Sequence, residues 1–210
     1  TEVAKYGEHN NNLIVDAVSH SQTIAIGGAS IVRYPLQNRI DFSRSCATTN
    51  VDAGISCKLH VSRFITGETY TLSFDYYLHS APDDNVLFEL KDGGTKLGGG
   101  NYFASPTTPT GAWSKHTVTF VSINSSTPDS NNIRLLLYSI KNSSVAIKNI
   151  MLVRGDKIGT FSPSQVDNAM TRVEQTANSY SIKFLNGAND ITTQLNLTNS
   201  GVRIKSSLIH

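Results

Sequence analysis

Alternation of apolar and polar residues, interrupted by turn residues, is the feature that most constrains the fold of this chain. The clearest case is 69–79, where one face of an extended strand would hold Tyr70, Leu72, Phe74, Tyr76 and Leu78. The predicted strands are 12–18, 22–26, 31–36, 38–43, 57–64, 69–79, 85–91, 114–122, 132–140 and 145–153. Turn clusters such as Gly27-Gly28 and Asp92-Gly93-Gly94 separate them. Because no helical period lies between the strands, the sequence predicts an all-β fold, an antiparallel β-sandwich.

Charge and hydropathy exclude several classes of partner. Charged residues make up 16% of the 210 residues, and the formal net charge is +2. A field this weak does not attract nucleic acid or an anionic membrane surface. No apolar run is long enough to span a bilayer. We therefore expect neither a nucleic-acid nor a membrane partner.

Motifs for catalysis and metal binding are missing from the sequence. The two cysteines, Cys46 and Cys57, are either paired or, the reading we favour, reduced thiols, and the six histidines are scattered without zinc-ligand spacing. No GxSxG, HExxH, P-loop or GxGxxG motif occurs. Asp41, Asp75 and Glu89 are carboxylates of the kind that glycosidases use, but nothing local marks two of them as a pair. We expect a protein that is not an enzyme and that has no cofactor.

The sequence texture divides the chain at about residue 162. Residues 1–11 form a polar lead-in, 12–162 the predicted sandwich, and 163–210 a helical linker followed by the start of a β-rich stalk. The linker helix is predicted from Ser162 and Pro163 as start signals and from a heptad-like stripe of Val166, Met170, Val173, Ala177 and Tyr180. A stripe this short needs a partner, either the sandwich or copies of itself. The stalk strands are too few to form a core alone, so we expect the chain to be a fragment of a longer protein.

A sheet face is the predicted binding surface. Sugars present hydroxyl groups beside apolar C–H faces, so a site for them needs aromatic rings for stacking and polar side chains for directed hydrogen bonds. Asp75, Tyr77 and His79 share the polar face of strand 69–79, and Arg134 and Tyr138 are expected to join them from a neighbouring strand. The predicted carbohydrate-binding set is Asp75, Tyr77, His79, Tyr102, Arg134 and Tyr138, with Tyr102 placed on a wall loop, 98–105. Trp113 is either a stacking platform or, the reading we favour, a core or edge anchor.

Four segments together carry a resemblance to a known family. They are Asn12-Leu13, Gly67–Phe74 (GETYTLSF), Gly111–Phe120 (GAWSKHTVTF) and Ile147–Gly155 (IKNIMLVRG). Their order and spacing over about 12–162 resemble the jelly-roll carbohydrate-binding modules of tail and baseplate proteins from bacteriophages of Gram-positive hosts. The stretch Asn196–Lys205 (NLTNSGVRIK) is similar to a unit of phage tail-fibre and minor structural proteins, where it continues into repetitive, often trimeric β structure.

The resemblance implies a virion component that is assembled in the host cytoplasm and acts outside the cell. It implies a non-catalytic module that binds host cell-wall or capsular saccharide, contacts other tail or baseplate proteins, and forms a homotrimer through the C-terminal segment. Related modules carry a structural calcium, for which Asp16 and Asp41 are the candidates here. Two rival functions stay open at this point: a structural spacer without a ligand, and a glycan-degrading enzyme.

Overall fold

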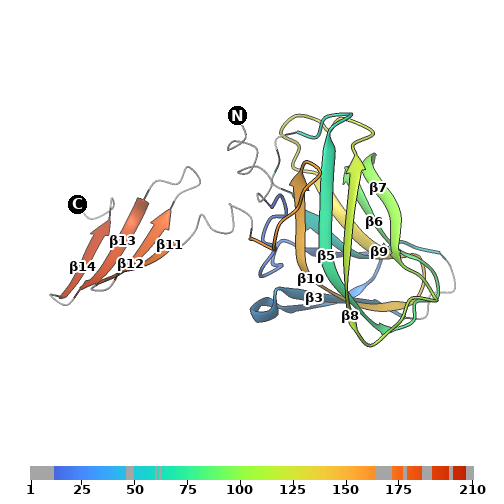
Figure 1. The fold of residues 1–210 in the computed structure, drawn as a ribbon, viewed down its shortest axis with the longest axis horizontal. Coiled ribbons are helices and arrows are strands. Elements are labelled where there is room, and N and C mark those ends of the chain that lie inside the picture. The colour runs from blue at the N-terminus through green and yellow to red at the C-terminus, as the bar shows by residue number, and fades with distance from the viewer. Residues whose placement is uncertain are drawn as a thin grey trace. The chain divides into compact units, whose positions relative to one another are not determined.

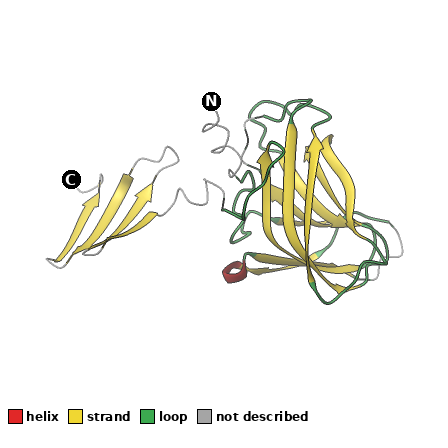
Figure 2. Cartoon of the chain, viewed as in Figure 1, coloured by secondary structure: helices red, strands yellow, loops and turns green. Residues whose placement is uncertain are grey.

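The computed structural model describes residues 12–45, 50–59, 61, 63–163, 172–176, 179–185, 191–198 and 201–206, and it describes side chains as far as 163. The chain divides into two compact units, Thr1–Ser164 and Gln165–His210. Within the described residues the only helical element is the short 3-10 turn η1 (Pro35–Gln37); the remainder is strand, turn and loop (Figure 2). No helix among these residues is long and apolar enough to cross a membrane.

The first unit is an antiparallel β-sandwich, as the alternation predicts (Figure 1). One five-stranded sheet, here called the β9 sheet, has the order β1-β4-β9-β6-β7. Its strands are β1 (Ile24–Ile26), β4 (Ala53–Lys58), β9 (Ile133–Ser139), β6 (Val86–Asp92) and β7 (Thr95–Ala104). The second, the β5 sheet, has the order β2-β3-β10-β5-β8. Its strands are β2 (Ser30–Tyr34), β3 (Arg39–Arg44), β10 (Ser143–Arg154), β5 (Thr69–Ser80) and β8 (Trp113–Val121).

The core lies between the two sheets and is built by the inward positions of each strand. In β5 the predicted apolar face is buried throughout, with Tyr76 the most accessible member at 9%. Phe88 of β6 and Phe103 of β7 are also buried, and the Phe103 ring stacks edge-on against Phe74 at a centroid distance of 4.9 Å. Burial of these apolar side chains is the main force that holds the two layers together.

A buried asparagine, Asn12, connects the start of the described chain with β10 and with the segment that follows it, residues 155–163, here called the exit segment. The side-chain amide of Asn12 donates to the carbonyl oxygens of Ile150 and Ser162, at 2.9 and 3.1 Å. Its side-chain oxygen accepts from the backbone N–H groups of Ile14 and Leu152, both at 3.1 Å. Since Asn12 is 2% exposed, three of these bonds are buried and the bond to Ser162 is partly buried.

Two strand predictions and one loop prediction are wrong. Segment 12–18 is not a strand but a turn-rich segment with one bridge, Ile14 to Leu59. The strand expected at 57–64 lies at Ala53–Lys58 instead. β7 was expected to be a loop because its centre is Gly98-Gly99-Gly100; it pairs with β6 through three register shifts, which accommodate the glycines.

The second unit is a four-stranded antiparallel sheet in sequential order, β11-β12-β13-β14. Its strands are β11 (Arg172–Thr176), β12 (Ser179–Leu185), β13 (Ile191–Thr198) and β14 (Gly201–Ser206). The helix expected after Pro163 is therefore wrong from Arg172 onward, where hydrogen bonding between strands replaces the helical ladder. Val166, Met170 and Ala177 lie outside the described residues.

Cys57 is a free thiol, completely buried in β4, so the alternative of a disulfide is wrong for this residue. Burial raises the pKa of Cys57 to about 12, which keeps the thiol protonated and unreactive. Cys46 lies outside the described residues.

Candidate functional site

The predicted site residues do not form one cluster, because their strands belong to different sheets. Asp75, Tyr77 and His79 share the outer face of β5, as expected. Arg134 and Tyr138 were expected beside them, but β9 is the central strand of the other sheet, so this expectation is wrong. Tyr102 lies in β7 of the β9 sheet rather than in a loop. The chain therefore has two candidate faces, one on each layer of the sandwich.

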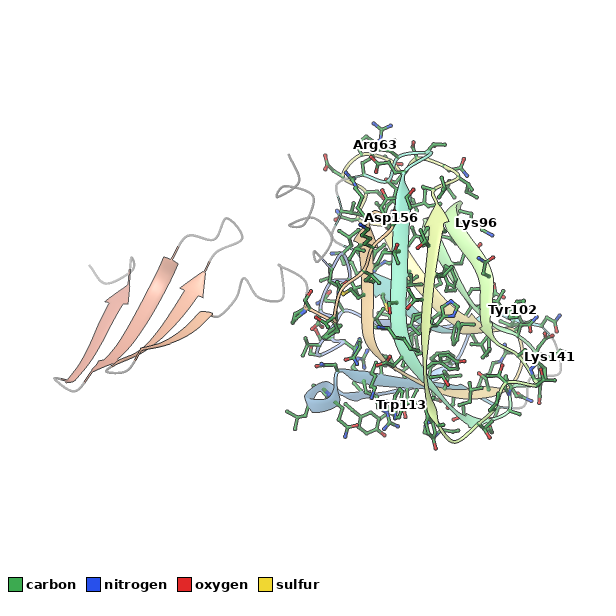
Figure 3. All side chains as sticks on the ribbon, viewed as in Figure 1. Arg63, Lys96, Tyr102, Trp113, Lys141 and Asp156 are labelled. Carbon is green, nitrogen blue, oxygen red and sulfur yellow. The ribbon has the colours of Figure 1, made fainter. Side chains whose placement is uncertain are left out.

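An aromatic and aliphatic row crosses the outer face of the β9 sheet. Tyr102 on β7 lies opposite Leu87 on β6, Leu87 lies opposite Tyr138 on β9, and Tyr138 lies opposite Gly54 on β4. Cross-strand partners share a face of the sheet and lie close enough to form one surface. Tyr102 is 63% exposed and Tyr138 only 7%, so the row runs from a projecting ring to a recessed one. Figure 3 shows Tyr102 on the edge strand.

A buried carboxylate lies next to this row. Glu89, on β6, is 8% exposed and forms ion pairs with Lys91 at 2.8 Å and Lys96 at 3.6 Å. The hydroxyl of Tyr138 lies close to the carboxylate of Glu89. Burial, with the nearby negative charges of Glu89 and Asp52, raises the pKa of Tyr138 to about 12, so this hydroxyl is a proton donor at any physiological pH.

Basic residues form a second row on the same face. Lys58 on β4 lies opposite Arg134 on β9, Arg134 lies opposite Lys91 on β6, and Lys91 lies opposite Lys96 on β7. Aromatic rings, a carboxylate and guanidinium and ammonium donors are thus combined on one half-exposed surface. Such a surface can stack an apolar ring face and donate and accept hydrogen bonds along its edges.

On the outer face of the β5 sheet, the three predicted residues have partners that the sequence did not indicate. Asp75 accepts a hydrogen bond from the side-chain amide of Asn149 at 2.8 Å. His79 Nε2 lies 3.3 Å from a carboxylate oxygen of Asp41. The ring of Tyr77 lies 5.6 Å from that of Trp113. Trp113 is 39% exposed on edge strand β8, so it is an edge residue and not part of the core, and its accessible ring leaves the stacking reading open (Figure 3).

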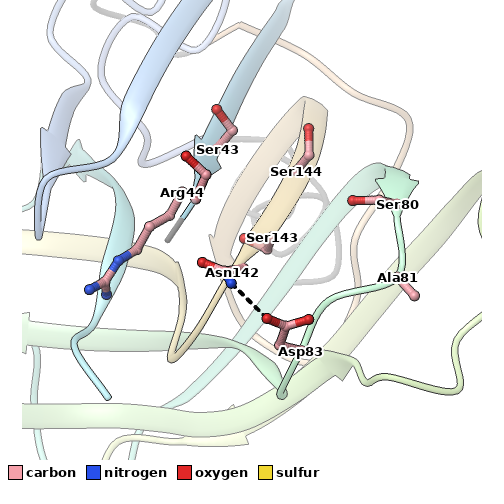
Figure 4. A pocket seen from close by; sticks show the side chains of 9 residues that line it. Ser43, Arg44, Ser80, Ala81, Asp83, Asn142, Ser143 and Ser144 are labelled. Carbon is pink, nitrogen blue, oxygen red and sulfur yellow. Dashed lines mark hydrogen bonds between the residues drawn. The ribbon is translucent and has the colours of Figure 1, made fainter. Parts of the chain in front are cut away.

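Two small pockets border the β5 sheet. A polar pocket of about 340 Å³ lies where β3, β5 and β10 end, and hydroxyl groups dominate its lining (Figure 4). At its edge, Asn142 donates to the carboxylate of Asp83 at 2.7 Å. A second pocket, of about 160 Å³, is lined by Asp75 and Lys115 together with residues 159–161 of the exit segment. The exit segment therefore borders the Asp75 end of this face, whereas the His79 end is exposed.

No group of three or more His, Cys, Asp or Glu that could hold a metal ion occurs in the described part of the chain. Both residues considered for calcium have other partners. Asp41 forms a two-bond ion pair with Arg39, at 2.7 and 2.6 Å. The carboxylate of Asp16 accepts hydrogen bonds from the hydroxyl groups of Ser19 and Ser21.

Sequence reasoning considered Glu89 only as a catalytic carboxylate and missed the lysines beside it, and it did not select Arg39 or Tyr34 of the opposite face. The alternation did carry a usable signal, because Glu89 stands between the apolar Phe88 and Leu90 and so belongs to the outer face of its strand. The sequence did not indicate the order of the strands, which places Glu89 near Tyr138 and Arg39 near Trp113.

Searches of protein families and of curated proteins found no match to this chain. Solved structures with a similar fold do exist. The tripod (BppUct-A-L) from the baseplate of bacteriophage Tuc2009 matches 94% of this chain and 87% of its own, with a TM-score of 0.53 and 11% identity. An arabinose-bound GH51 α-L-arabinofuranosidase matches 70% of this chain, with a TM-score of 0.52 and 12% identity. A CBM4 structure matches 65% of this chain and 96% of its own, with a TM-score of 0.46 and 13% identity.

This chain spans 27% of the length of the arabinofuranosidase chain, so the likeness there concerns one part of a larger protein. The likeness to the baseplate tripod covers more than the first unit, which ends at Ser164. At these identities the comparisons show the fold: an all-β antiparallel sandwich of the kind found in a phage baseplate tripod and in part of a glycoside hydrolase.

Proposed function

We propose that this chain is a non-catalytic carbohydrate-binding module of a phage tail or baseplate, and that it binds saccharide on the outer face of the β9 sheet. The observation that carries the proposal is the Tyr102–Leu87–Tyr138 row, flanked by Glu89 and by the basic row. A sugar ring would stack on Tyr102, while Arg134 and the Tyr138–Glu89 pair would bond to its hydroxyl groups. The set Tyr102, Arg134 and Tyr138 is the half of the predicted site that the fold brings to one face.

The comparisons support this role through the proteins in which the fold occurs. One is named as part of a phage baseplate, and another is named as an arabinose-bound α-L-arabinofuranosidase. The proposal accordingly places this chain on a virion, with other baseplate proteins as neighbours and a host cell-surface saccharide as ligand.

The arrangement of carboxylates supports binding rather than catalysis. A glycosidase needs two carboxyl groups facing one bond, about 5–9 Å apart. Glu89 lies on the β9 sheet, whereas Asp41 and Asp75 lie on the β5 sheet. Each of the three is engaged, Glu89 with lysines, Asp41 with Arg39 and Asp75 with Asn149.

The proposal includes trimer formation through residues 163–210. A four-stranded sheet whose strands have five to eight residues has little core of its own, so packing against copies of itself would stabilise it. Three binding faces on one stalk raise the apparent affinity for a repetitive glycan by orders of magnitude, and weak single sites then suffice. Light scattering of the chain with and without residues 163–210 tests this part, and a monomeric full chain contradicts it.

The binding proposal is tested with host cell-wall polysaccharide in a pull-down and by calorimetry. Tyr102→Ala is expected to weaken binding about tenfold, because burying an aromatic face against a ligand contributes about 1.5 kcal/mol. Ile123→Ala, which removes a side chain of similar exposure (55%), is the matched control and should bind like the wild type. Unchanged binding by Tyr102→Ala and Arg134→Gln contradicts the assignment of this face. No binding by the wild type favours the spacer function, and release of reducing ends indicates an enzyme.

A further inference from the structure

A second surface with the composition of a binding site lies on the other layer of the sandwich. Two cross-strand rows define it, here called the Trp113 face. One runs through Tyr34, Arg39, Lys148, Asp75 and Lys115, and the other through Val32, Asp41, Ala146, Tyr77 and Trp113. These residues come from all five strands of the β5 sheet, so the surface depends on the assembled sheet and not on one loop.

Cations surround the aromatic rings on this face. The ammonium group of Lys148 lies 4.1 Å from the centroid of the Trp113 ring, and the guanidinium carbon of Arg39 lies 5.9 Å from it. The same guanidinium lies 4.6 Å from the centroid of Tyr34. Contacts of this kind hold the aromatic and cationic side chains in fixed relative positions, which lowers the entropy lost when a ligand binds.

The rings are also accessible. Trp113 is 39% exposed and Tyr34 is 37% exposed. Both rings lie beside Arg39, and its planar guanidinium group donates two hydrogen bonds to the carboxylate of Asp41. An apolar ring beside a fixed carboxylate–guanidinium pair can stack a sugar ring and bond to neighbouring hydroxyl groups of that ring.

The charges on this face are unbalanced toward positive. Three cationic residues, Arg39, Lys148 and Lys115, stand against two carboxylates, Asp41 and Asp75, so one positive charge is in excess. Arg39 pairs with Asp41, whereas Asp75 accepts a hydrogen bond from the neutral amide of Asn149 and keeps its charge. Lys148 and Lys115 form no ion pair with any residue in the described part of the chain, although both lie opposite Asp75 in register. The ammonium groups of Lys148 and Lys115 therefore lie beside the aromatic rings with only the Asp75 carboxylate between them in register. An anionic group on the ligand would be complementary to them.

We propose that the Trp113 face is a second saccharide-binding site, distinct from the face of the β9 sheet, and that it takes a sugar carrying a carboxylate or phosphate. The ring of the sugar stacks on Trp113, its hydroxyl groups bond to the Asp41–Arg39 pair, and its anionic group lies beside the ammonium group of Lys148, with Lys115 adding to the positive charge nearby. Uronic acids and phosphodiester-linked wall polymers both present this chemistry.

Because Trp113 is the single tryptophan of the chain, its fluorescence reports on this site directly. The full chain is titrated with tri-galacturonic acid, with a glycerol-phosphate oligomer, and with the neutral methyl ester of the trisaccharide. One or both anionic probes are expected to change Trp113 emission with saturation, and the ester should bind at least fivefold more weakly. Raising the salt concentration from 0.05 to 0.5 M should weaken anionic binding, since the contacts are screened. Which anionic probe binds more tightly identifies the source of the charge.

The variant Lys148→Gln/Lys115→Gln keeps most of each side chain and removes both charges, so it should lose at least fivefold in affinity for the anionic probe. Calorimetry with Trp113→Ala should show no binding at this site, and Tyr102→Ala on the opposite face should bind the anionic probe normally. Melting curves by circular dichroism establish that each variant is folded. Unchanged emission and no heat with either anionic probe overturn the proposal. Equal binding of the neutral ester overturns the charge assignment, and an emission change that depends on protein concentration and on dimer formation shows a protein contact instead.

Discussion

His116 gives the sharpest prediction about stability, because a half-buried titratable ring packs against an aromatic part of the core. Its ring lies 5.3 Å from Phe74, 5.9 Å from Phe103 and 6.0 Å from Phe88, between centroids. Its Nε2 atom is buried and has no hydrogen-bond partner among the residues that the structure describes. An unsatisfied buried nitrogen costs about 1–3 kcal/mol. His116→Leu removes that atom and keeps an apolar side chain of similar size, so it should raise the free energy of unfolding by roughly 1–2 kcal/mol.

The pH dependence follows from the same environment. Burial lowers the pKa of His116 below its ordinary value of 6.5, so the folded protein favours the neutral ring. The contribution of the neutral His116 ring to the free energy of unfolding is fully present well above pH 6.5. It is lost as the pH falls from 6.5 toward the lower pKa of the folded state. At pH 5 this loss is at most about 2 kcal/mol, a bound set by the pKa of the unfolded chain. The advantage of His116→Leu should therefore grow between pH 8 and pH 5.

Urea unfolding, followed by the fluorescence of Trp113 on the same strand, measures both effects. His79→Gln is the matched control, because His79 is exposed and faces Asp41 rather than the core. This variant should keep the acid-dependent loss that His116→Leu abolishes. If His116→Leu were destabilised at pH 8, or if its free energy of unfolding followed the wild-type pH curve, the reasoning about a buried neutral ring would be refuted.

Three further predictions concern the framework of the β9 sheet and its site. Gly54→Ala would place its Cβ 2.1 Å from a backbone carbonyl oxygen of β9, so it should lose about 1–3 kcal/mol in urea unfolding, whereas Gly94→Ala has no atom within 4 Å to meet and should lose far less. Cys57, with a pKa of about 12 caused by burial, should react with Ellman's reagent at the rate of global unfolding; rapid labelling of Cys57 at pH 8 in native buffer contradicts its burial. Glu89→Gln should lower the pKa of Tyr138 from about 12 in an absorbance titration at 295 nm, but only in part, because desolvation is the larger cause; an unchanged titration contradicts the contact between the two side chains.

The fold class could be predicted from the sequence because its signal is local. Side chains alternate every second residue in any strand, so β5 and β10 were identified nearly to their ends, together with the buried face of β5. Because a local pattern carries no information about pairing between strands, it also led to the wrong predictions. Gly98-Gly99-Gly100 reads as a turn, yet hydrogen bonds from β6 hold it in strand β7. The spacing of Val173 and Tyr180 suits a helix, yet strand pairing in β11 and β12 prevails.

What the sequence alone determined is which residues face outward, and this includes every member of the predicted site except Tyr102, which was expected on a loop. Which outward residues meet one another was decided only by the tertiary structure. Tyr138 is 61 positions from Tyr77 in the chain, and nothing in the alternation says whether β9 pairs with β5 or with β6. The order of strands depends on contacts between distant segments, whose free energy is expressed only when both layers close on one core. That order separates Tyr77 from Tyr138, gives each face its own aromatic rings and cations, and so makes two candidate surfaces out of one predicted site.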